Sequence, residues 1–352
     1  MQIKKMESPK IGVIKTDNIG DAVLASPFFF ELRKNFKHAN ITAYLSHAGK
    51  EVLDGLNLFD CIKIINPLWL KYKRVAFIKR IFSALRFISV INKEKFDVLI
   101  GMRYQDRLTS LIMSLSNAKN KIGYDVKNMG FGIDTKIKIP DRKTHEIFKN
   151  LAILKYLGIV KEPKIKLGFS ITKSSENKVK MILEENKIKK YIVIHPISGH
   201  ISKDWGTERF NVLANNLSQK YKIVIAGLAS DKGINEFRGE NILNLAGKLD
   251  IKELGSLIKN SFMVIGGDSA AVHIGQVFDK KTLTIFSGAA FYEGWTAYGK
   301  KSFIIIKDTS CRGCELIECN RKHECLDIEI NFVIRIIDRI LKGLQKQKII
   351  EA

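Results

Sequence analysis

Short apolar runs alternate with helical stretches along most of the chain, and this alternation limits the fold more than any other feature. Runs such as residues 11–16 (IGVIKT), 96–100 (FDVLI) and 191–195 (YIVIH) are rich in β-branched residues and almost continuously apolar. Such runs are typical of strands that are buried on both faces. The pattern therefore predicts parallel sheets covered by helices on both faces. The other predicted strands are residues 41–45, 61–65, 222–226, 241–245, 263–265 and 282–286.

The alternation occurs in two series, separated by residues 158–173, which contain Pro163 and Gly168 and lack a clear period. We therefore predict two doubly wound, Rossmann-like α/β domains, residues 1–165 and 166–352, that face each other across a cleft with the ligand at the carboxyl ends of the strands. For the predicted terminal helix, 332–348, packing back on the N-terminal domain is left open. Another predicted helix begins at the turn after the first strand. The remaining predicted helices span 49–56, 70–95, 106–116, 143–157, 207–220, 231–237, 251–259 and 270–278.

The chain is strongly basic, with 59 Lys and Arg against 36 Asp and Glu, a net charge of +23. This balance favours an anionic partner: a nucleotide, a nucleic acid, a phosphorylated glycan or a membrane surface. Basic residues are spread through both halves, and no helix-turn-helix or RNA-binding signature occurs, so we predict no nucleic-acid partner. The sequence has no long apolar run and no signal-peptide pattern, which favours the cytoplasm.

The predicted helix 70–95 carries an apolar stripe between faces crowded with Lys and Arg. Such a helix suits either an anionic membrane surface or the solvated side of a helix packed on the core, and the sequence leaves both open. The stripe consists of Ile78, Ile81, Phe82, Leu85 and Ile88.

Residues 263–275 (MVIGGDSAAVHIG) resemble a buried strand that runs directly into a helix. Two glycines allow a tight turn, and Asp268 and Ser269 stand at the expected N-cap, where unpaired N–H groups attract anions. An ordinary capped turn, with His273 in the core, explains the same residues. The stretch alone leaves both interpretations open.

Three further groups follow predicted strands. Lys15, Asn18 and Asp21 surround the turn after the first strand, where a carboxylate can accept a proton from an attacking hydroxyl. Lys203 follows the first strand of the second series and can hold a diphosphate, while Asp231 follows the next strand and can bind ribose hydroxyls. A helix-start carboxylate, a surface lysine and an N-cap are the respective alternatives.

Taken in order, KTDNIGDAVL (15–24), KDW (203–205), NLAGK (244–248) and GDSAAVH (267–273) resemble the ADP-heptose:lipopolysaccharide heptosyltransferases, glycosyltransferase family 9. The resemblance spans nearly the whole chain. It implies a GT-B fold, with the acceptor on the N-terminal domain, the ADP-sugar on the C-terminal domain, and inversion in a single displacement. We therefore predict a cytoplasmic enzyme, peripheral on the inner membrane, that transfers heptose from ADP-heptose to the anionic inner core of lipopolysaccharide.

The resemblance also assigns roles to residues. It implies that Asp21 is the general base, with Lys15 and Asn18 on the acceptor side. It further implies that Lys203 binds the donor phosphates and that Asp268 contacts the heptose. The other donor-binding residues that it implies are Ser198, Gly199, Asp231, Leu249, Ser269, Ala270, Ala271 and His273.

Two departures from the family pattern concern the donor. Gly199 offers no hydroxyl, and Ala270-Ala271 replace a Gly-containing pair of some members. They leave open a same-fold glycosyltransferase that uses another nucleotide sugar or acts on another polysaccharide or a protein. A sugar-nucleotide binder without turnover is a further alternative.

Four cysteines, Cys311, Cys314, Cys319 and Cys325, crowd one segment that resembles the cysteine-rich segment of some family members. Four thiolates at such spacing suit a structural zinc or iron ion, and reduced thiols without metal are the alternative. We predict no cofactor in catalysis, because a four-cysteine site has no open position and basic residues can neutralise a leaving diphosphate.

Overall fold

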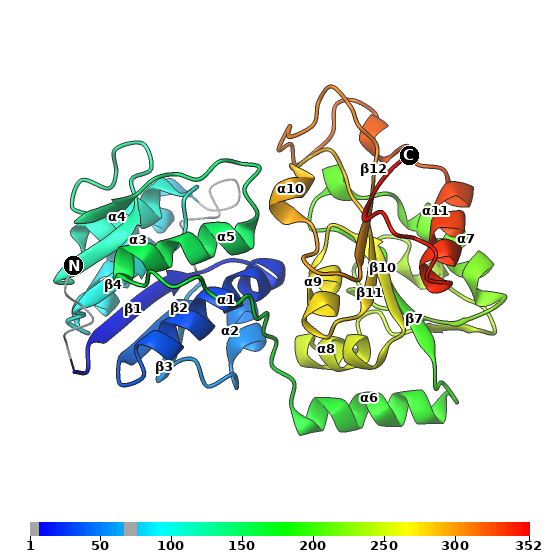
Figure 1. Ribbon diagram of the computed structural model, residues 1–352, viewed down its shortest axis with the longest axis horizontal. Coiled ribbons are helices and arrows are strands. Elements are labelled where there is room, and N and C mark those ends of the chain that lie inside the picture. The colour runs from blue at the N-terminus through cyan, green and yellow to red at the C-terminus, as the bar shows by residue number, and fades with distance from the viewer. Residues whose placement is uncertain (1–6, 67–75) are drawn as a thin grey trace. The chain divides into compact units, whose positions relative to one another are not determined.

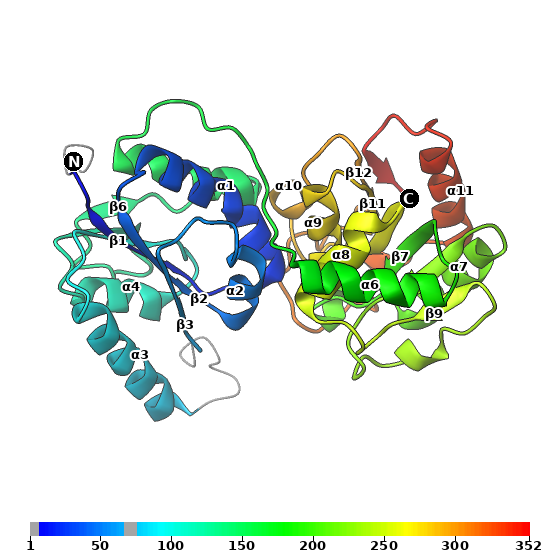
Figure 2. The same cartoon turned by 90° about the horizontal axis from the view of Figure 1, so that it is seen from below.

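Each half of the chain builds one parallel sheet with helices on both faces (Figures 1 and 2). The computed structural model describes residues 7–66 and 76–352. The chain divides into two compact units, Met1–Gly168 and Phe169–Ala352. The first part of the predicted helix 70–95 lies outside the described residues.

The sheet of the first unit has the order β3-β2-β1-β4-β5-β6, and the pairings between its described strands are parallel. Along the chain, β2 and β3 extend the sheet on one side of β1, and β4, β5 and β6 extend it on the other side. The strand order therefore reverses between β1 and β4. In open parallel sheets the loops after two such strands diverge, and ligands usually bind between them. We call this place, at the carboxyl ends of β1 and β4, the crevice of the first unit. The strands are β1 (Lys10–Lys15), β2 (Asn40–Leu45), β3 (Cys61–Ile64), β4 (Val98–Gly101), β5 (Asn120–Tyr124) and β6 (Thr135–Ile137).

The helices of the first unit are α1 (Ile19–Asn35), α2 (His47–Leu53), α3 (Phe77–Asn92), α4 (Arg107–Leu115) and α5 (Glu146–Leu151), which continues as the 3₁₀ helix Ala152–Leu157. Helices α1 and α5 cover one face of the sheet, and α3 and α4 cover the other (Figure 2). On the second face, Tyr44 packs edge-on against Phe87 of α3 and against Phe96. This aromatic cluster fixes α3 on the sheet.

The predicted apolar stripe of α3 faces the core only in part: Ile81 and Ile88 are half-buried, and Ile88 packs against the core cluster. The structure buries Ala84, Phe87 and Ile91, whereas Ile78 and the other outward residues of the stripe are exposed. Both sets have helical spacing, so the helix has two apolar faces, and only the position of the sheet decides which one is buried.

The sheet of the second unit has the order β13-β12-β11-β10-β7-β8-β9, again with parallel pairings. Its direction reverses between β7 and β10, which places the second crevice at the ends of these strands. The strands are β7 (Tyr191–His195), β8 (Lys222–Ile225), β9 (Ile242–Asn244), β10 (Met263–Gly267), β11 (Lys281–Ile285), β12 (Ser302–Ile306) and β13 (Ile349–Glu351).

The helices of the second unit are α6 (Lys173–Glu185), α7 (Thr207–Ser218), α8 (Ile251–Asn260), α9 (Ala270–Val277), α10 (Tyr292–Trp295) and α11 (Ile330–Leu341). The predicted helix 231–237 is reduced to a 3₁₀ turn, Ile234–Glu236, because Gly233 adopts a positive φ directly before it. The predicted terminal helix, α11, belongs to the second unit. Val333, Ile336 and Ile340 of α11 are buried in the core of the second unit, beside α7.

Within the described parts of the chain, no helix is both long enough and apolar enough to cross a bilayer.

Candidate functional site

An ion pair between Lys203 and Asp268 lies at the crevice of the second unit. Asp268 directly follows β10, and Lys203 ends a 3₁₀ turn in the loop after β7, so the two residues meet where the sheet direction reverses. Lys203 Nζ lies 2.5 Å from Asp268 Oδ2, and the side chains are 23% and 7% exposed. His273 Nε2, one turn into α9, lies 4.0 Å from Asp268 Oδ1. The structure thus brings together three residues that the sequence had placed in one site.

Two glycines let the loop after β7 lie over the end of β10. A Cβ atom on Gly266 would lie 2.7 Å from the carbonyl oxygen of His195, and one on Gly267 would lie 2.4 Å from Ser198 Oγ. Real Cβ atoms do not approach other atoms so closely, so any larger residue would push the loop away. The glycines therefore hold Ser198 and Lys203 near Asp268.

The lysine loop is anchored on both sides of Lys203. Before it, the Ser202 N–H donates a hydrogen bond of 3.1 Å to the carbonyl of Ile317. After it, Trp205 is buried in the core, where its Nε1–H donates to the carbonyl of Ile328 at 3.2 Å. A side chain flanked by such anchors is held in place before a ligand arrives.

The N-terminus of α9 and two serine hydroxyls add unused polar groups to this crevice. Ser269 occupies the N-cap of α9 but makes no side-chain capping bond. Ser198 Oγ and Ser269 Oγ are buried, and neither has a hydrogen-bond partner among the residues that the structure describes. Leaving a buried hydroxyl unpaired costs about 1–3 kcal/mol, so such groups gather where a ligand completes the bonding. Ala270 and Ala271 form the first turn of α9 and leave its backbone N–H groups unobstructed by long side chains.

Two histidines near the crevice favour the neutral form. Burial holds the pKa of His195, the last residue of β7, below its usual range, with Asp231 opposing the shift. Burial and the positive charge of Lys203 lower the pKa of His200, with Asp268 opposing.

The remaining predicted donor residues are placed less centrally. Asp231 Oδ2 accepts the N–H of Leu228 at 2.7 Å and so closes its own turn, but it does not cap the following 3₁₀ turn, whose N-cap is Gly233. Leu249 is half-buried beside Asp250, the N-cap of α8. Gly199 is exposed, and no atom lies within 4 Å of the place where its Cβ would be.

A second charged cluster lies at the crevice of the first unit. Lys15 ends β1, and its Nζ lies 2.9 Å from Asp17 Oδ2, while Arg103, just after β4, pairs with the other carboxylate oxygen of Asp17. Burial lowers the pKa of Lys15, whereas the charges of Asp21 and Glu146 raise it. Burial also lowers the pKa of Arg103. Two largely buried cations thus lie at the carboxyl ends of the central strands, where a ligand is expected.

Asp21 stands at the third position of α1. Its Oδ2 accepts the N–H of Asn18 at 3.3 Å as part of a capping box, so the carboxylate also has the structural role that the sequence left open. Its negative charge nevertheless acts on Lys15 and on Tyr104, whose pKa values it raises. Asp21 is thus a half-buried carboxylate beside the buried cation Lys15 at the carboxyl end of the sheet.

The sequence did not predict the network of Tyr104, Glu146 and Lys149. Tyr104 Oη donates to Glu146 Oε1 at 2.6 Å, and Lys149 Nζ lies 2.7 Å from the same oxygen and 3.1 Å from Tyr104 Oη. Burial, followed by the charge of Glu146, raises the pKa of Tyr104, so the phenol stays protonated. Tyr104 and Arg103 follow β4 directly, and this position at a strand end was the signal available for finding them.

Comparison with known proteins identifies the family. Residues 84–324 match glycosyltransferase family 9 (heptosyltransferase). The chain belongs to glycosyltransferase family 9. The resemblance seen in the sequence is thereby confirmed, and the protein is a glycosyltransferase.

Relatives of this family-9 glycosyltransferase cover most of its length. Lipopolysaccharide heptosyltransferase 3 of Escherichia coli strain K12 is 27% identical over 79% of this chain and 83% of its own. The family-9 glycosyltransferase structure from Veillonella parvula has a TM-score of 0.78 at 18% identity, covering 95% of this chain and 97% of that one. The E. coli heptosyltransferase WaaC with ADP-2-deoxy-2-fluoro heptose has a TM-score of 0.68 at 14% identity, covering 94% and 99%. These structures confirm the predicted GT-B fold class.

For the cysteine segment of this family-9 chain the sequence left a structural metal ion and reduced thiols open. Among the described residues, no group of three or more His, Cys, Asp or Glu side chains could hold a metal ion. Cys319 Sγ accepts the N–H of Arg321 at 3.3 Å, and Cys311 Sγ lies 3.5 Å from Thr309 Oγ1. Burial raises the pKa of Cys325, which favours the thiol over the thiolate that a metal requires.

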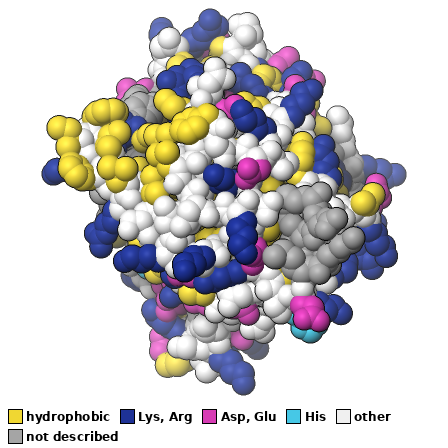
Figure 3. All heavy atoms as spheres, turned by 90° about the vertical axis from the view of Figure 1, so that its left-hand side faces the viewer, with side chains coloured by type: hydrophobic (Ala, Val, Ile, Leu, Met, Phe, Trp, Pro, Cys, Tyr) yellow, Lys and Arg dark blue, Asp and Glu magenta, His cyan; other side chains and the backbone are white. Residues whose placement is uncertain are grey.

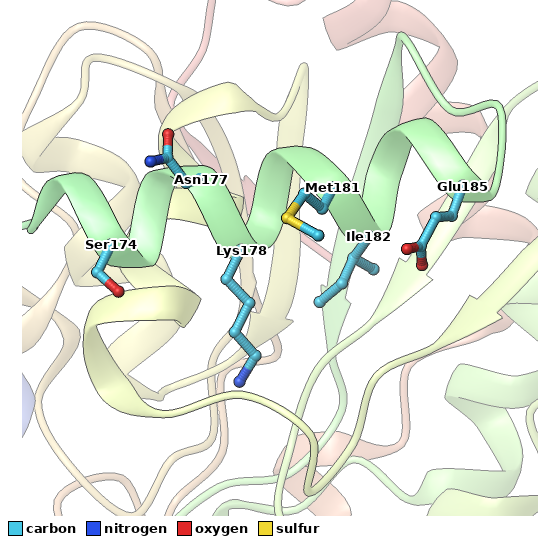
Figure 4. Close-up of a pocket in the computed structure, with 6 residues that line it drawn as sticks. All are labelled: Ser174, Asn177, Lys178, Met181, Ile182 and Glu185. Atoms are coloured by element: carbon cyan, nitrogen blue, oxygen red, sulfur yellow. The ribbon is translucent and has the colours of Figure 1, made fainter.

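A surface depression of about 570 Å³ lies along α6, and neither Lys203 nor Asp268 lines it. Its lining comes from one helix, and Asn177 points to the opposite side of that helix from Lys178 (Figure 4). Ligand sites usually combine groups that converge from several elements. The depression lacks that convergence, and no residue predicted to bind a ligand lines it.

Proposed function

We propose that this chain transfers a heptose from ADP-heptose to the inner core of lipopolysaccharide, with inversion at the anomeric carbon. The observation that carries the proposal is the Lys203–Asp268 pair at the carboxyl ends of β7 and β10, beside the N-terminus of α9. A fixed cation, a helix N-terminus and buried hydroxyls suit a diphosphate, and the carboxylate suits the hydroxyls of a sugar.

On the donor side, the proposed role of Lys203 is to neutralise the diphosphate as it leaves. Because the lysine is already held by its anchored loop, little reorganisation accompanies the charge that develops on the phosphate oxygen. Asp268 orients Lys203 in the free protein and contacts the heptose when the donor is bound. The hydroxyls of Ser198 and Ser269 would gain the hydrogen bonds that they lack in the described chain.

On the acceptor side, we propose Asp21 as the general base. The acceptor oxygen attacks the anomeric carbon, its proton passes to the Asp21 carboxylate, and the bond between the anomeric carbon and the phosphate oxygen breaks, so that ADP leaves. Lys15 and Arg103, the two cations near Asp21, suit an acceptor that carries phosphate or carboxylate groups. The relatives from E. coli and Campylobacter jejuni are named lipopolysaccharide and lipooligosaccharide heptosyltransferases, which supports this choice of acceptor.

A same-fold enzyme with another nucleotide sugar or another acceptor is the alternative. The open space around Gly199 favours it, because the loop after β7 can admit a differently substituted sugar at this point. The same space is equally available to water, so the donor must be decided by experiment.

The deciding experiment measures thermal stabilisation by ADP, UDP and GDP, followed by ADP-heptose and by transfer to lipopolysaccharide acceptors with and without a complete inner core. A ligand that binds only the folded state raises stability by about 2.7 kcal/mol at a hundredfold excess over its dissociation constant. We expect selective stabilisation by ADP, a larger effect of ADP-heptose, and transfer to a heptose-deficient core. Stabilisation by UDP or GDP alone would replace the donor, and no response to any nucleotide would refute the donor site.

A further inference from the structure

Helix α3 has a second apolar face that turns away from the sheet. Ala84, Phe87 and Ile91 already attach the helix to the core. The outer face of α3 consists of four large apolar side chains that are between 51% and 67% exposed: Phe77, Ile78, Phe82 and Leu85. Ile78, Phe82 and Leu85 are spaced i, i+4 and i+7, so they form one continuous stripe.

This outer face contributes nothing to the core of its unit. Single exposed apolar residues are ordinary, but several together on one helix usually mark an interaction surface. Hydrophobic side chains gather beside basic ones on the side of the molecule that carries α3 (Figure 3). The stripe therefore needs a partner that covers apolar side chains.

The charges around the stripe restrict the partner. Lys79, Arg80 and Arg86 lie on α3 itself, and the helix carries no acidic residue. Between Asp60 and Glu94 the sequence contains eight Lys or Arg and neither Asp nor Glu. The partner must therefore be apolar and anionic at once.

We infer that the outer face of α3 docks the enzyme on an anionic lipid membrane. Large apolar side chains flanked by cations are typical of helices that lie in the interface, with the apolar side among the acyl chains and the cations at the headgroups. With 16 residues, α3 is shorter than a spanning helix and suits this parallel orientation. The inference rests on the proposed function for its purpose, because a lipopolysaccharide acceptor is itself embedded in a membrane.

A second copy of the chain fits this surface less well. An isologous contact would bring the outer face of α3 against the same face of another copy. Lys79 and Arg86 of the two copies would then meet without any acidic residue of α3 to neutralise them. A membrane of anionic lipids supplies the negative charge that such a dimer lacks.

The test is co-sedimentation of the full chain with vesicles of phosphatidylcholine, with and without about 30% phosphatidylglycerol, in the absence of donor and acceptor. We expect binding that requires phosphatidylglycerol and weakens with salt. Replacing Phe82 and Leu85 together by Ser should reduce the partition coefficient at least about tenfold, because both side chains leave the acyl region. Lys79→Gln with Arg86→Gln should reduce it about fivefold for each charge removed.

Met181→Ser is the matched control, since Met181 is also an exposed apolar residue, 59% accessible, on a helix of the other unit. It should leave vesicle binding unchanged. Absence of binding to anionic vesicles, or an equal loss in the control, would overturn the inference, and so would a dimer in solution that the Phe82/Leu85 variant dissociates. ADP-induced stabilisation of each variant reports separately on the donor site, so failure of the proposed function leaves the vesicle result interpretable, and the reverse also holds.

Discussion

Replacing Lys203 by Ala is expected to weaken ADP binding more than it weakens the fold. The ammonium group lies 2.5 Å from Asp268 and is 23% exposed, so it is reachable from the crevice without unfolding the loop. The loop itself is anchored by Trp205 and Ser202, which the substitution does not touch. Loss of the cation therefore removes the proposed phosphate contact while the surrounding backbone stays in place.

The size of the effect follows from two opposing contributions. A hydrogen bond to a charged group contributes about 1.5–3 kcal/mol. In the free protein, however, Lys203 is already paired with Asp268, so a phosphate replaces part of an existing interaction. We therefore expect the lower part of this range, about 1.5–2 kcal/mol, which corresponds to ADP binding that is about ten- to thirtyfold weaker.

The measurement is titration calorimetry with ADP, with Lys178→Ala as the matched control. Lys178 Nζ lies 2.8 Å from Glu253, a buried carboxylate of the same unit, but on α6, away from the crevice. Both variants remove a lysine from a shielded carboxylate, so their losses of folding stability should be similar. Only Lys203→Ala should affect ADP. If the two variants bind ADP within twofold of each other, the assignment of Lys203 to the diphosphate is refuted.

Asp268→Asn separates the two roles proposed for Asp268. It removes the partner that competes with phosphate for Lys203, so ADP alone should bind at least as tightly as before. Binding of ADP-heptose should lose its advantage over ADP, because the sugar contact is weakened. Equal losses for both ligands would instead mean that Asp268 acts only by holding the loop.

Three further predictions concern catalysis, packing and pH. Asp21→Asn, which retains an oxygen for the capping box, should lower kcat about 10²- to 10⁴-fold while ADP-induced stabilisation is unchanged. Gly267→Ala should lower the free energy of unfolding by about 1–3 kcal/mol and weaken ADP binding, because the new Cβ would lie 2.4 Å from Ser198 Oγ. Gly199→Ala is the control and should change neither quantity; calorimetric melts measure stability and titrations measure ADP binding. Burial holds the pKa of His195 below its ordinary value of 6.5, so below that pH the unfolded chain binds more protons than the folded chain. Folding stability should therefore fall as the pH drops below about 6.5. Thermal melts should show a smaller fall in His195→Asn.

The central strands were predictable because their residues are buried on both faces. β1, β7 and β10 each contain a short apolar run that includes Val and Ile, and their predicted bounds agree with the structure to within two residues. Strands near the sheet edges lack this signal. β5 begins with Asn and Lys, and β13 has only three residues, so neither stands out from a loop.

Helix α3 shows the limit of periodicity as a guide. Its sequence contains two apolar stripes, one through Ala84, Phe87 and Ile91 and one through Ile78, Phe82 and Leu85. Periodicity identifies a helix but does not say which stripe meets the sheet. Tyr44 and Phe96, which come from other strands and loops, decide the orientation through contacts that no local window contains.

The candidate site likewise contains one residue pair that the sequence predicts and one that it does not. Lys203 and Asp268 are 65 positions apart, yet both follow strands that meet where the sheet direction reverses, so a prediction from strand ends was able to pair them. Tyr104 and Glu146 are 42 positions apart, and Glu146 begins a helix and does not follow a strand. Their contact depends on the packing of α5, which the sequence does not reveal.

The two units share one strand order. In each, the first strand lies beside the fourth, β1 beside β4 and β7 beside β10, so both units place their polar residues at the same point of the fold. The second unit adds glycines, a short helix and one accessible lysine, a combination suited to a compact diphosphate. The first unit instead buries Lys15 and Arg103 around Asp17 and backs them with Glu146 and its partners. Charges held this rigidly in low-dielectric surroundings discriminate between anions by geometry, so under the proposed function the choice of acceptor should depend on Arg103 more than on any residue of the second unit.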